Sequence, residues 1–246
     1  MFLSISAEDF GRLESYLPRG LVVSDESDPL QRARGRIQRL ILMQRLHPGH
    51  KVPMDEVAQH VGASRTPVRE ALRLLETEGV VQSLPNRGFI VRRIGPEEAV
   101  SLYDTRGCLE RHAATRAIER RSRAFVADLR ALHRIYERVL SGPEDRRRLG
   151  MLVDKAFHLR IAEQAGNAHL TEVLANTFDR LILTRPMDGF PVSRMKAALD
   201  EHKAILAAFE ARRPKAVVEA VAKNVEEGGA AIVAHLRRLD EFHAQA

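Results

Sequence analysis

Two residues in the second half of the chain have the types and spacing of a metal-ligand pair. Asp154 and His158 are four residues apart, so on a helix they lie one turn apart on the same face. The apolar neighbours Val153, Phe157 and Ile161 indicate that this face is turned largely inward. A buried carboxylate and imidazole need polar partners, and a divalent metal is one such partner. Spacing alone favours the other interpretation, a hydrogen-bonded core pair.

A third ligand could come from another helix, where His202 follows Glu201. An activated water held by this set would make the protein a metal-dependent hydrolase. That alternative also needs a general base beside the water, and Glu163 and Glu201 are only weak candidates for it. It also leaves unexplained a second group of residues, which have the types that contact nucleic acid.

This second group follows Gly62. Ser64 can cap a helix, its hydroxyl accepting a bond from a backbone N–H one turn in. Pro67 falls in the first turn, where a missing N–H costs little. Apolar residues then recur at three- and four-residue steps and bury one face: Val68, Ala71, Leu72 and Leu75. The other face carries polar and cationic side chains: Arg65, Thr66, Arg69 and Arg73.

The elements on either side of this helix predict a winged helix-turn-helix. Upstream, the pattern of residues 54–61 predicts a short helix, and Gly62 lets the chain turn sharply. Downstream, residues 80–84 and 89–92 are typical of two strands joined by a tight turn. Such a hairpin is a wing, and its tip consists of Asn86, Arg87 and Gly88. Without the hairpin, the same two helices would fit any helical hairpin.

The winged segment closely resembles the DNA-binding domain of GntR-type bacterial transcription regulators over about residues 30–93. The resemblance is carried by Pro48-Gly49, Ser64-Arg-Thr-Pro-Val-Arg-Glu-Ala-Leu72, Leu75-Glu-Thr-Glu-Gly-Val80 and Pro85-Asn-Arg-Gly88. It implies a double-stranded DNA operator as partner. The expected DNA-binding residues are Ser64, Arg65, Thr66, Arg69, Arg73, Asn86, Arg87 and Gly88.

Charge is distributed as this interpretation requires. Residues 29–95 contain twelve Lys/Arg and five Asp/Glu, a net charge of +7, whereas the whole chain carries +6. A basic segment on a near-neutral remainder suits a polyanionic partner for that segment alone. The alternative is chance clustering of solvated arginines.

From Gly95 onward the pattern is helical almost throughout. Pro96 suits the first position of a helix, and acids follow it. Helices are expected at about 96–120, 123–141, 144–165, 168–185, 193–212 and 214–242. The predicted fold class is therefore mainly α, an N-terminal winged helix-turn-helix followed by an all-α six-helix bundle. We expect an N-terminal extension at 1–28, a DNA-binding domain at 29–94, and a helical effector-binding and dimerisation domain at 95–246.

The helical segment also resembles a known domain, the FCD-type ligand-binding domain of the FadR-like branch of the GntR family. The matching residues are Asp154-Lys-Ala-Phe-His158, Gly166-Asn167-Ala-His-Leu170 and Glu201-His202. The resemblance implies a divalent metal, Zn²⁺ or similar, held by one Asp and three His. Asp154, His158 and His202 match three of these positions, but Asn224 stands where the fourth ligand, a third histidine, is expected. An amide oxygen is a weaker ligand than imidazole, so Zn²⁺ should be favoured less strongly and water or an effector could complete the shell.

Arg106 is the remaining candidate, because the resemblance places an arginine there facing the effector cavity. A guanidinium can clamp a carboxylate bidentately while a metal takes one of its oxygens. An equally acceptable interpretation is a structural Arg106–Glu110 pair at i,i+4. Asn224 is the second expected effector contact. From the resemblance and these residues we expect a homodimeric repressor that is released from its operator by a small organic acid.

The rest of the sequence limits where the protein works. Cys108 is the single cysteine, which excludes a disulfide framework. No apolar run approaches the roughly 18 residues of a membrane span, and acids near the N-terminus do not suit a secretory signal. We therefore expect a cytoplasmic protein without a membrane partner, and we assign no function to residues 1–28.

Overall fold

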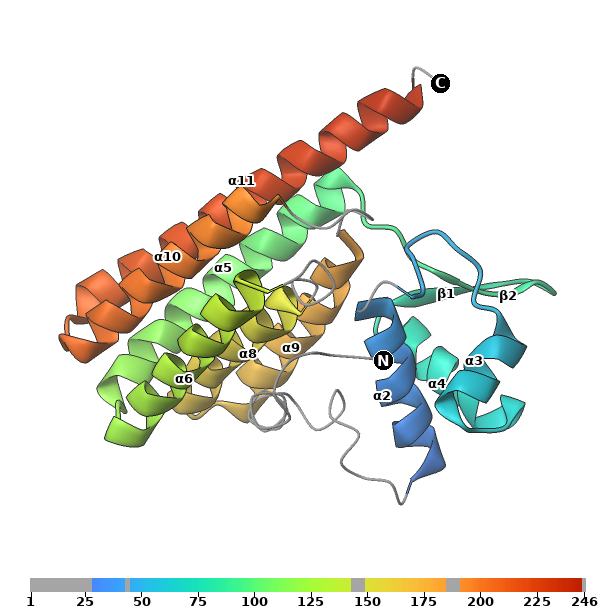
Figure 1. The fold of residues 1–246 in the computed structure, drawn as a ribbon, viewed down its shortest axis with the longest axis horizontal. Helices are drawn as coiled ribbons and strands as arrows, with labels where there is room; N and C mark the ends of the chain where they lie inside the picture. Colours follow the sequence, from blue (N-terminus) through green and yellow to red (C-terminus); the bar gives the residue numbers. More distant parts are fainter. Residues whose placement is uncertain (1–27, 43–44, 143–148, 185–190, 245–246) are drawn as a thin grey trace. The chain divides into compact units, whose positions relative to one another are not determined.

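The structure, a computed structural model, describes residues 28–42, 45–142, 149–184 and 191–244 (Figure 1). These residues divide into two compact units. The first contains residues 28–94 together with 179–184, and the second contains residues 95–178 and 191–244. Residues 1–27, which make up nearly all of the expected N-terminal extension, lie outside the described residues.

Three helices form the body of the first unit: α2 (Pro29–Leu42), α3 (Met54–Val61) and α4 (Arg65–Thr77). Both α2 and α3 pack against α4, whose apolar face is buried as its spacing predicts. Gly62 ends α3 with a φ of 63°, a left-handed conformation that glycine adopts without a steric penalty. The turn that directs α4 away from α3 therefore depends on this glycine.

A short antiparallel hairpin follows α4, with β1 (Val81–Leu84) paired to β2 (Gly88–Val91). Its register sets Leu84 opposite Gly88, so residues 85–87 form the loop of the predicted wing. The segment before α3 also runs along β2, since the Gly49 N–H donates to Val91 O at 2.7 Å and the Val52 N–H to Phe89 O at 2.8 Å. This additional pairing was not predicted from the sequence, and it covers the free side of β2 near its buried end.

Ser64 occupies the N-cap position of α4, as predicted. The prediction that its hydroxyl caps the helix is wrong, because the side chain accepts no hydrogen bond there. Pro67 occupies the third helical position and has no N–H, which removes one of the two usual donors to an N-cap side chain. The hydroxyl of Ser64 therefore remains exposed at the start of α4.

The second unit is built of helices, which confirms the predicted fold class. Its elements are α5 (Pro96–Glu119), α6 (Arg123–Leu140), α8 (Gly150–Ala165), α9 (Ala168–Leu181), α10 (Val192–Glu210) and α11 (Pro214–Ala244). The last three residues of α9 and the short 3-10 turn η1 (Ile182–Thr184) that follows them belong to the first unit. In Figure 1, α5, α10 and α11 run side by side, and α11 packs on both of the others. Helix α8 packs against α5 and α6, so its position is central.

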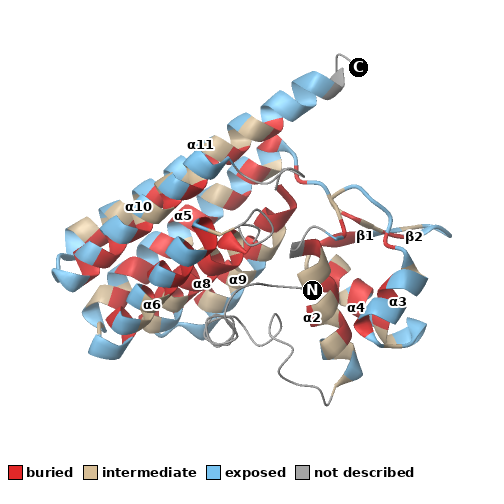
Figure 2. Ribbon diagram, viewed as in Figure 1, coloured by how far each residue is buried: buried red, intermediate tan, exposed pale blue. Residues whose placement is uncertain are grey.

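The bounds of α8 differ from expectation at the N-terminal end. The predicted helix 144–165 begins at Gly150, and residues 143–148 lie outside the described residues. Gly150 is at a close approach of helices, because a β-carbon there would lie 2.6 Å from Cε of Met195 and 3.2 Å from Cε2 of Tyr136. Almost every face of α8 is buried (Figure 2), so the two polar side chains at 154 and 158 lie within the packed interior.

The missing cap at Ser64 has a measurable consequence. Ser64→Ala should change the free energy of unfolding by less than about 0.5 kcal/mol, because no capping bond is lost. The matched control is Ser122→Ala, since the Ser122 hydroxyl accepts from the Phe125 N–H at 3.0 Å and its loss should cost about 1 kcal/mol. Denaturant unfolding measures both values, and an equal loss in the two variants would contradict this account of α4.

Candidate metal and effector site and DNA-binding surface

Three of the predicted ligands converge in the core of the helical unit. Nε2 of His202, from α10, lies 3.3 Å from Nε2 of His158 and 3.2 Å from Oδ1 of Asp154, both from α8. Nε2 of His158 lies 3.9 Å from the same Asp154 oxygen. Both imidazoles are buried, and the side chain of Asp154 is 18% exposed. The predicted face of α8 therefore meets the predicted third ligand from α10.

These distances fit a metal ion. Ligands at about 2.0–2.1 Å from a tetrahedral ion lie about 3.3–3.4 Å from one another. Two of the three separations, 3.3 and 3.2 Å, are close to that value, and the third, 3.9 Å, is longer by about half an ångström. Two imidazole nitrogens that face each other at 3.3 Å beside a carboxylate are a suitable donor set for Zn²⁺ or a similar divalent ion.

Glu110 of α5 holds His158 from behind. Its Oε2 lies 2.5 Å from Nδ1 of His158, and its Oε1 accepts from Nε of Arg106, also at 2.5 Å. A carboxylate beside Nδ1 favours the tautomer that carries its proton there, and in this tautomer the lone pair of Nε2 is available to a metal. Glu110 thus orients one ligand and fixes Arg106 at the same time.

Arg106 is buried, and it forms the i,i+4 pair with Glu110 that the sequence left open. Its guanidinium carbon lies 4.4 Å from the centroid of the Phe178 ring and 5.6 Å from that of Tyr103. Among the described residues, its buried Nη2 has no hydrogen-bond partner. The ion pair therefore uses one edge of the guanidinium and leaves an amino group for another acceptor.

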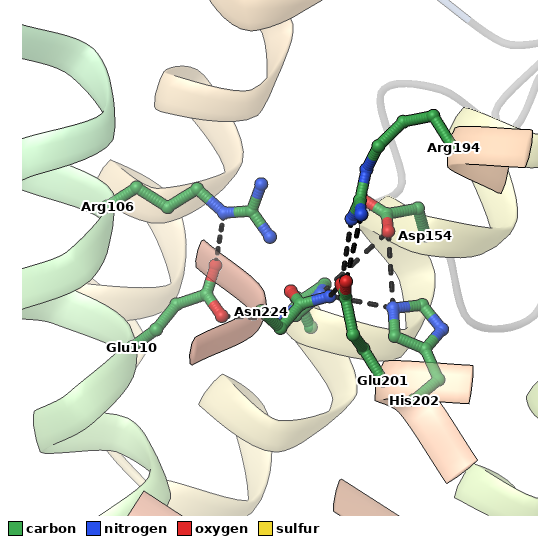
Figure 3. Close-up of polar contacts among 8 residues, drawn as sticks. Arg106, Glu110, Asp154, Arg194, Glu201, His202 and Asn224 are labelled. Carbon is green, nitrogen blue, oxygen red and sulfur yellow. Dashed lines mark hydrogen bonds and ion pairs between the residues drawn. The ribbon is translucent and has the colours of Figure 1, made fainter. Parts of the chain in front are cut away.

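Asn224 of α11 is buried, and its amide nitrogen donates to Oε2 of Glu201 at 2.7 Å. Glu201 is held a second time by Arg194, with both carboxylate oxygens bonded at 2.8 and 2.7 Å. Because the amide nitrogen is directed at Glu201, the amide oxygen is the atom of Asn224 that remains for other contacts. Figure 3 shows this group beside Asp154 and His202.

Burial and charge together keep the site in a ligand-ready form. Burial would raise the pKa of Asp154, but its hydrogen bond with His202 and the nearby His158 and Arg106 hold that pKa well below its usual value. Burial lowers the pKa of His202, against the opposing effect of Asp154. The pKa of Glu110 is also lowered, since Arg106 and His158 outweigh its burial. Ionised carboxylates and a neutral imidazole are the forms that bind metal.

The predicted DNA-binding residues all lie on the surface of the first unit. Ser64, at the N-cap of α4, and Arg65, Thr66, Arg69 and Arg73, on α4 itself, are exposed. The other three, Asn86 and Arg87 of the wing loop and Gly88 at the start of β2, are also exposed. The structure thus gathers them into two patches, one on α4 and one at the wing tip.

Two arginines of α2 have structural partners within the unit. Arg34 pairs with Glu78 at 2.7 Å, and Arg36 donates to the backbone oxygen of Val61. These contacts join α2 to the ends of α4 and α3. The basic charge of residues 29–95 is therefore partly used to hold the unit together.

Sequence reasoning missed three of these contacts. The sequence indicates Glu110 only as a partner of Arg106. Its contact with His158 joins α5 to α8, and no local sequence pattern indicates such a contact between helices. Arg194 was not singled out, although its spacing of seven from Glu201 places both on one face of α10. The bidentate contact of Arg65 with Asp55 of α3 was also missed.

Comparison with known proteins agrees with both units. Residues 29–91 match the family described as bacterial regulatory proteins, gntR family, and residues 101–227, more than half of the chain, match the FCD domain. The chain belongs to the GntR family. The regulator is 30% identical to the Nta operon transcriptional regulator of Aminobacter aminovorans over 141 residues, 57% of its own length and 66% of that relative.

Other relatives extend the likeness. The regulator is 24% identical over 187 residues to the HTH-type transcriptional regulator YdhC of Bacillus subtilis, covering 76% of its own chain and 83% of YdhC. The solved structure of E. coli McbR/YncC superposes with a TM-score of 0.75 at 19% identity, over 85% of this chain and 98% of that one. At 19% identity, the similarity to McbR/YncC shows that the two proteins share a fold and nothing more.

The family decides between the two function classes. The regulator is a DNA-binding transcription regulator and not an enzyme, because the matched families and named relatives are regulators. Both candidate bases of the hydrolase alternative have other partners: Glu201 is bonded to Arg194 and Asn224, and Glu163 is half exposed and faces Arg160 at 3.6 Å. None of the helices in the described ranges has the length and hydropathy needed to cross a membrane.

Proposed function

We propose that the regulator is a homodimeric repressor that leaves its operator when a small carboxylate binds in the helical unit beside a divalent metal. Residues 29–94 would be the DNA-binding domain, and residues 95–246 the effector-binding and dimerisation domain. The observation that carries the proposal is the convergence of Asp154, His158 and His202 in a core that also contains Arg106 with an unused Nη2. When bound, the metal would supply a positive charge that attracts a carboxylate oxygen.

Counting the charges of this core supports a carboxylate effector. Asp154 and Glu110 are negative, Arg106 is positive, and Arg194 balances Glu201. With neutral imidazoles, these groups sum to −1, so a divalent ion would bring the core to +1. A single carboxylate would then make it neutral, and buried charges are stable only when they are compensated.

The contacts expected of each residue follow from its chemistry. Arg106 would donate its free amino group to the acid, and the amide oxygen of Asn224 would face either the metal or the acid. In the first unit, Arg65, Thr66 and Arg69 would reach base edges or phosphates from α4. The remaining predicted contacts, made by Ser64, Arg73 and the wing residues Asn86, Arg87 and Gly88, would position the unit on the DNA backbone or in the minor groove.

The proposed release follows from dimer geometry. Two recognition helices bind two half-sites only when their separation matches that of the operator. Linking two weak contacts in one dimer raises affinity strongly, and this gain is lost when the geometry no longer fits. An acid that changes the separation would therefore lower operator affinity by an amount equal to its preference for the altered state.

Arg69→Ala should weaken operator binding and leave the fold intact, because Arg69 is exposed on α4. A bidentate contact between an arginine and a base contributes about 1–3 kcal/mol to binding. Gel shifts on the DNA upstream of the regulator's own gene measure the effect. The control is Arg111→Ala, which removes an exposed arginine from α5. Equal operator affinities of Arg69→Ala and the wild type would contradict the assignment of Arg69 as a DNA contact.

Zn²⁺ binding tests the proposed metal site separately. His158→Ala should weaken Zn²⁺ binding by more than about 100-fold, and Glu110→Gln by about 10–100-fold, because the first removes a ligand and the second removes the group that orients it. Asn224→His should strengthen binding by supplying a fourth ligand, the third imidazole of the site. His133→Ala, at another buried histidine of the same unit, is the control. Competition with a chromogenic chelator gives the affinities, and identical values in His158→Ala and His133→Ala would refute the site.

A further inference from the structure

Asp55 and Arg65 form a two-point contact across the turn of the helix-turn-helix. Nε of Arg65 donates to Oδ1 of Asp55 and its Nη2 donates to Oδ2, both at 2.5 Å. Asp55 is the second residue of α3, and Arg65 is the first residue of α4. The contact therefore fixes a guanidinium at the start of the helix proposed to read DNA.

The stability of the unit does not explain this pair. The side chains of Arg65 and Asp55 are 67% and 71% exposed, and pairs in such positions contribute little to folding because solvent screens them. In contrast, Arg34–Glu78 joins two helices at sites that are about four-fifths buried. An exposed pair with both donor positions aligned mainly restricts where the guanidinium can point.

The restriction leaves a defined set of donors. Arginine has five N–H groups, and the carboxylate takes one from Nε and one from Nη2. Both hydrogens of Nη1 and the second hydrogen of Nη2 remain, and they point away from Asp55. This is a pair of adjacent amino groups of the kind that reads O6 and N7 of guanine.

Asp55 also changes the electrostatics of this surface. A phosphate at the remaining N–H groups of Arg65 would meet a guanidinium whose positive charge Asp55 already neutralises, and the negative charge of Asp55 would repel it. A base edge, which carries no net charge, meets less of this repulsion. The pair therefore disfavours sequence-independent contacts more than it disfavours a base contact.

We propose that Asp55 is a specificity-determining residue, which positions Arg65 for a base contact and restrains it from binding phosphates. The inference rests on the proposed function in one respect, that α4 contacts DNA. It assigns to α3 a role in discriminating sequences.

The test compares two duplexes of equal length and composition. One is the sequence that the wild-type protein selects from a random library, and the other is a shuffled version of it. Asp55→Asn keeps the shape of the side chain but removes its charge. It should strengthen binding to the shuffled duplex by about threefold to tenfold and steepen the salt dependence by about one ion, since Arg65 becomes free to neutralise a phosphate. The ratio of the two affinities should fall by about tenfold.

Glu56→Gln is the matched control, since it makes the same charge change at the next, exposed residue of α3. It should change the affinity ratio by less than about twofold. In an Arg65→Ala background, Asp55→Asn should leave the affinity ratio unchanged, because the residue acts through Arg65.

The inference is overturned if Asp55→Asn behaves like Glu56→Gln, or if its effect on the ratio persists without Arg65. It is also overturned if Arg65→Ala binds both duplexes as the wild type does. In that last case, loss of binding in Arg69→Ala would leave the proposed function standing. Circular dichroism of each variant confirms that the exposed substitutions have not disturbed the helices.

Discussion

Glu110 is a carboxylate that folding removes almost entirely from water, so it must be paired within the protein. Arg106 holds one of its oxygens and His158 holds the other, each at 2.5 Å. Removing Arg106 would leave the charge of Glu110 buried without compensation, and removing His158 would leave one of its oxygens without this contact. This constraint fixes α5 against α8, gives His158 its orientation, and leaves Arg106 with an unused Nη2. Glu110 thus contacts both a proposed metal ligand, His158, and the proposed effector-binding residue, Arg106.

A second polar group completes the interior. Arg194, Glu201 and Asn224 connect the start of α10 with the middle of α11, and His202 follows Glu201 directly. The ring of His202 stacks on Phe157 with centroids 4.2 Å apart, so aromatic packing as well as charge holds the imidazole in place. Asn224 is held by a partner of its own and is therefore more than a missing ligand. Its hydrogen bond to Glu201 determines which end of the amide can face a ligand.

Local sequence pattern predicted most of the fold, because the apolar face of a helix and the residues of a turn can be recognised within short stretches of sequence. The apolar face of α4, the turn at Gly62 and the hairpin at residues 85–88 are examples. The capping prediction at Ser64 considered the hydroxyl that would accept the bond but not the backbone N–H that would donate it. Pro67, three residues later, has no N–H, so the sequence itself shows that one of the two usual donors is missing. Contacts between segments were less accessible. The pairing of residues 49–52 with β2 and of Glu110 with His158 depends on tertiary packing, and neither has a periodic signature.

The central claim is that metal and acid share the core around Asp154, His158 and His202, and calorimetry tests it most directly. A thermal-shift panel of acetate, lactate, pyruvate and succinate identifies an acid that binds. The affinity of that acid is then measured with protein stripped by a chelator and with protein reloaded with Zn²⁺. The account predicts tighter binding to the loaded protein, with the acid tightening Zn²⁺ by the same factor. Equal affinities of the acid for stripped and loaded protein would contradict it.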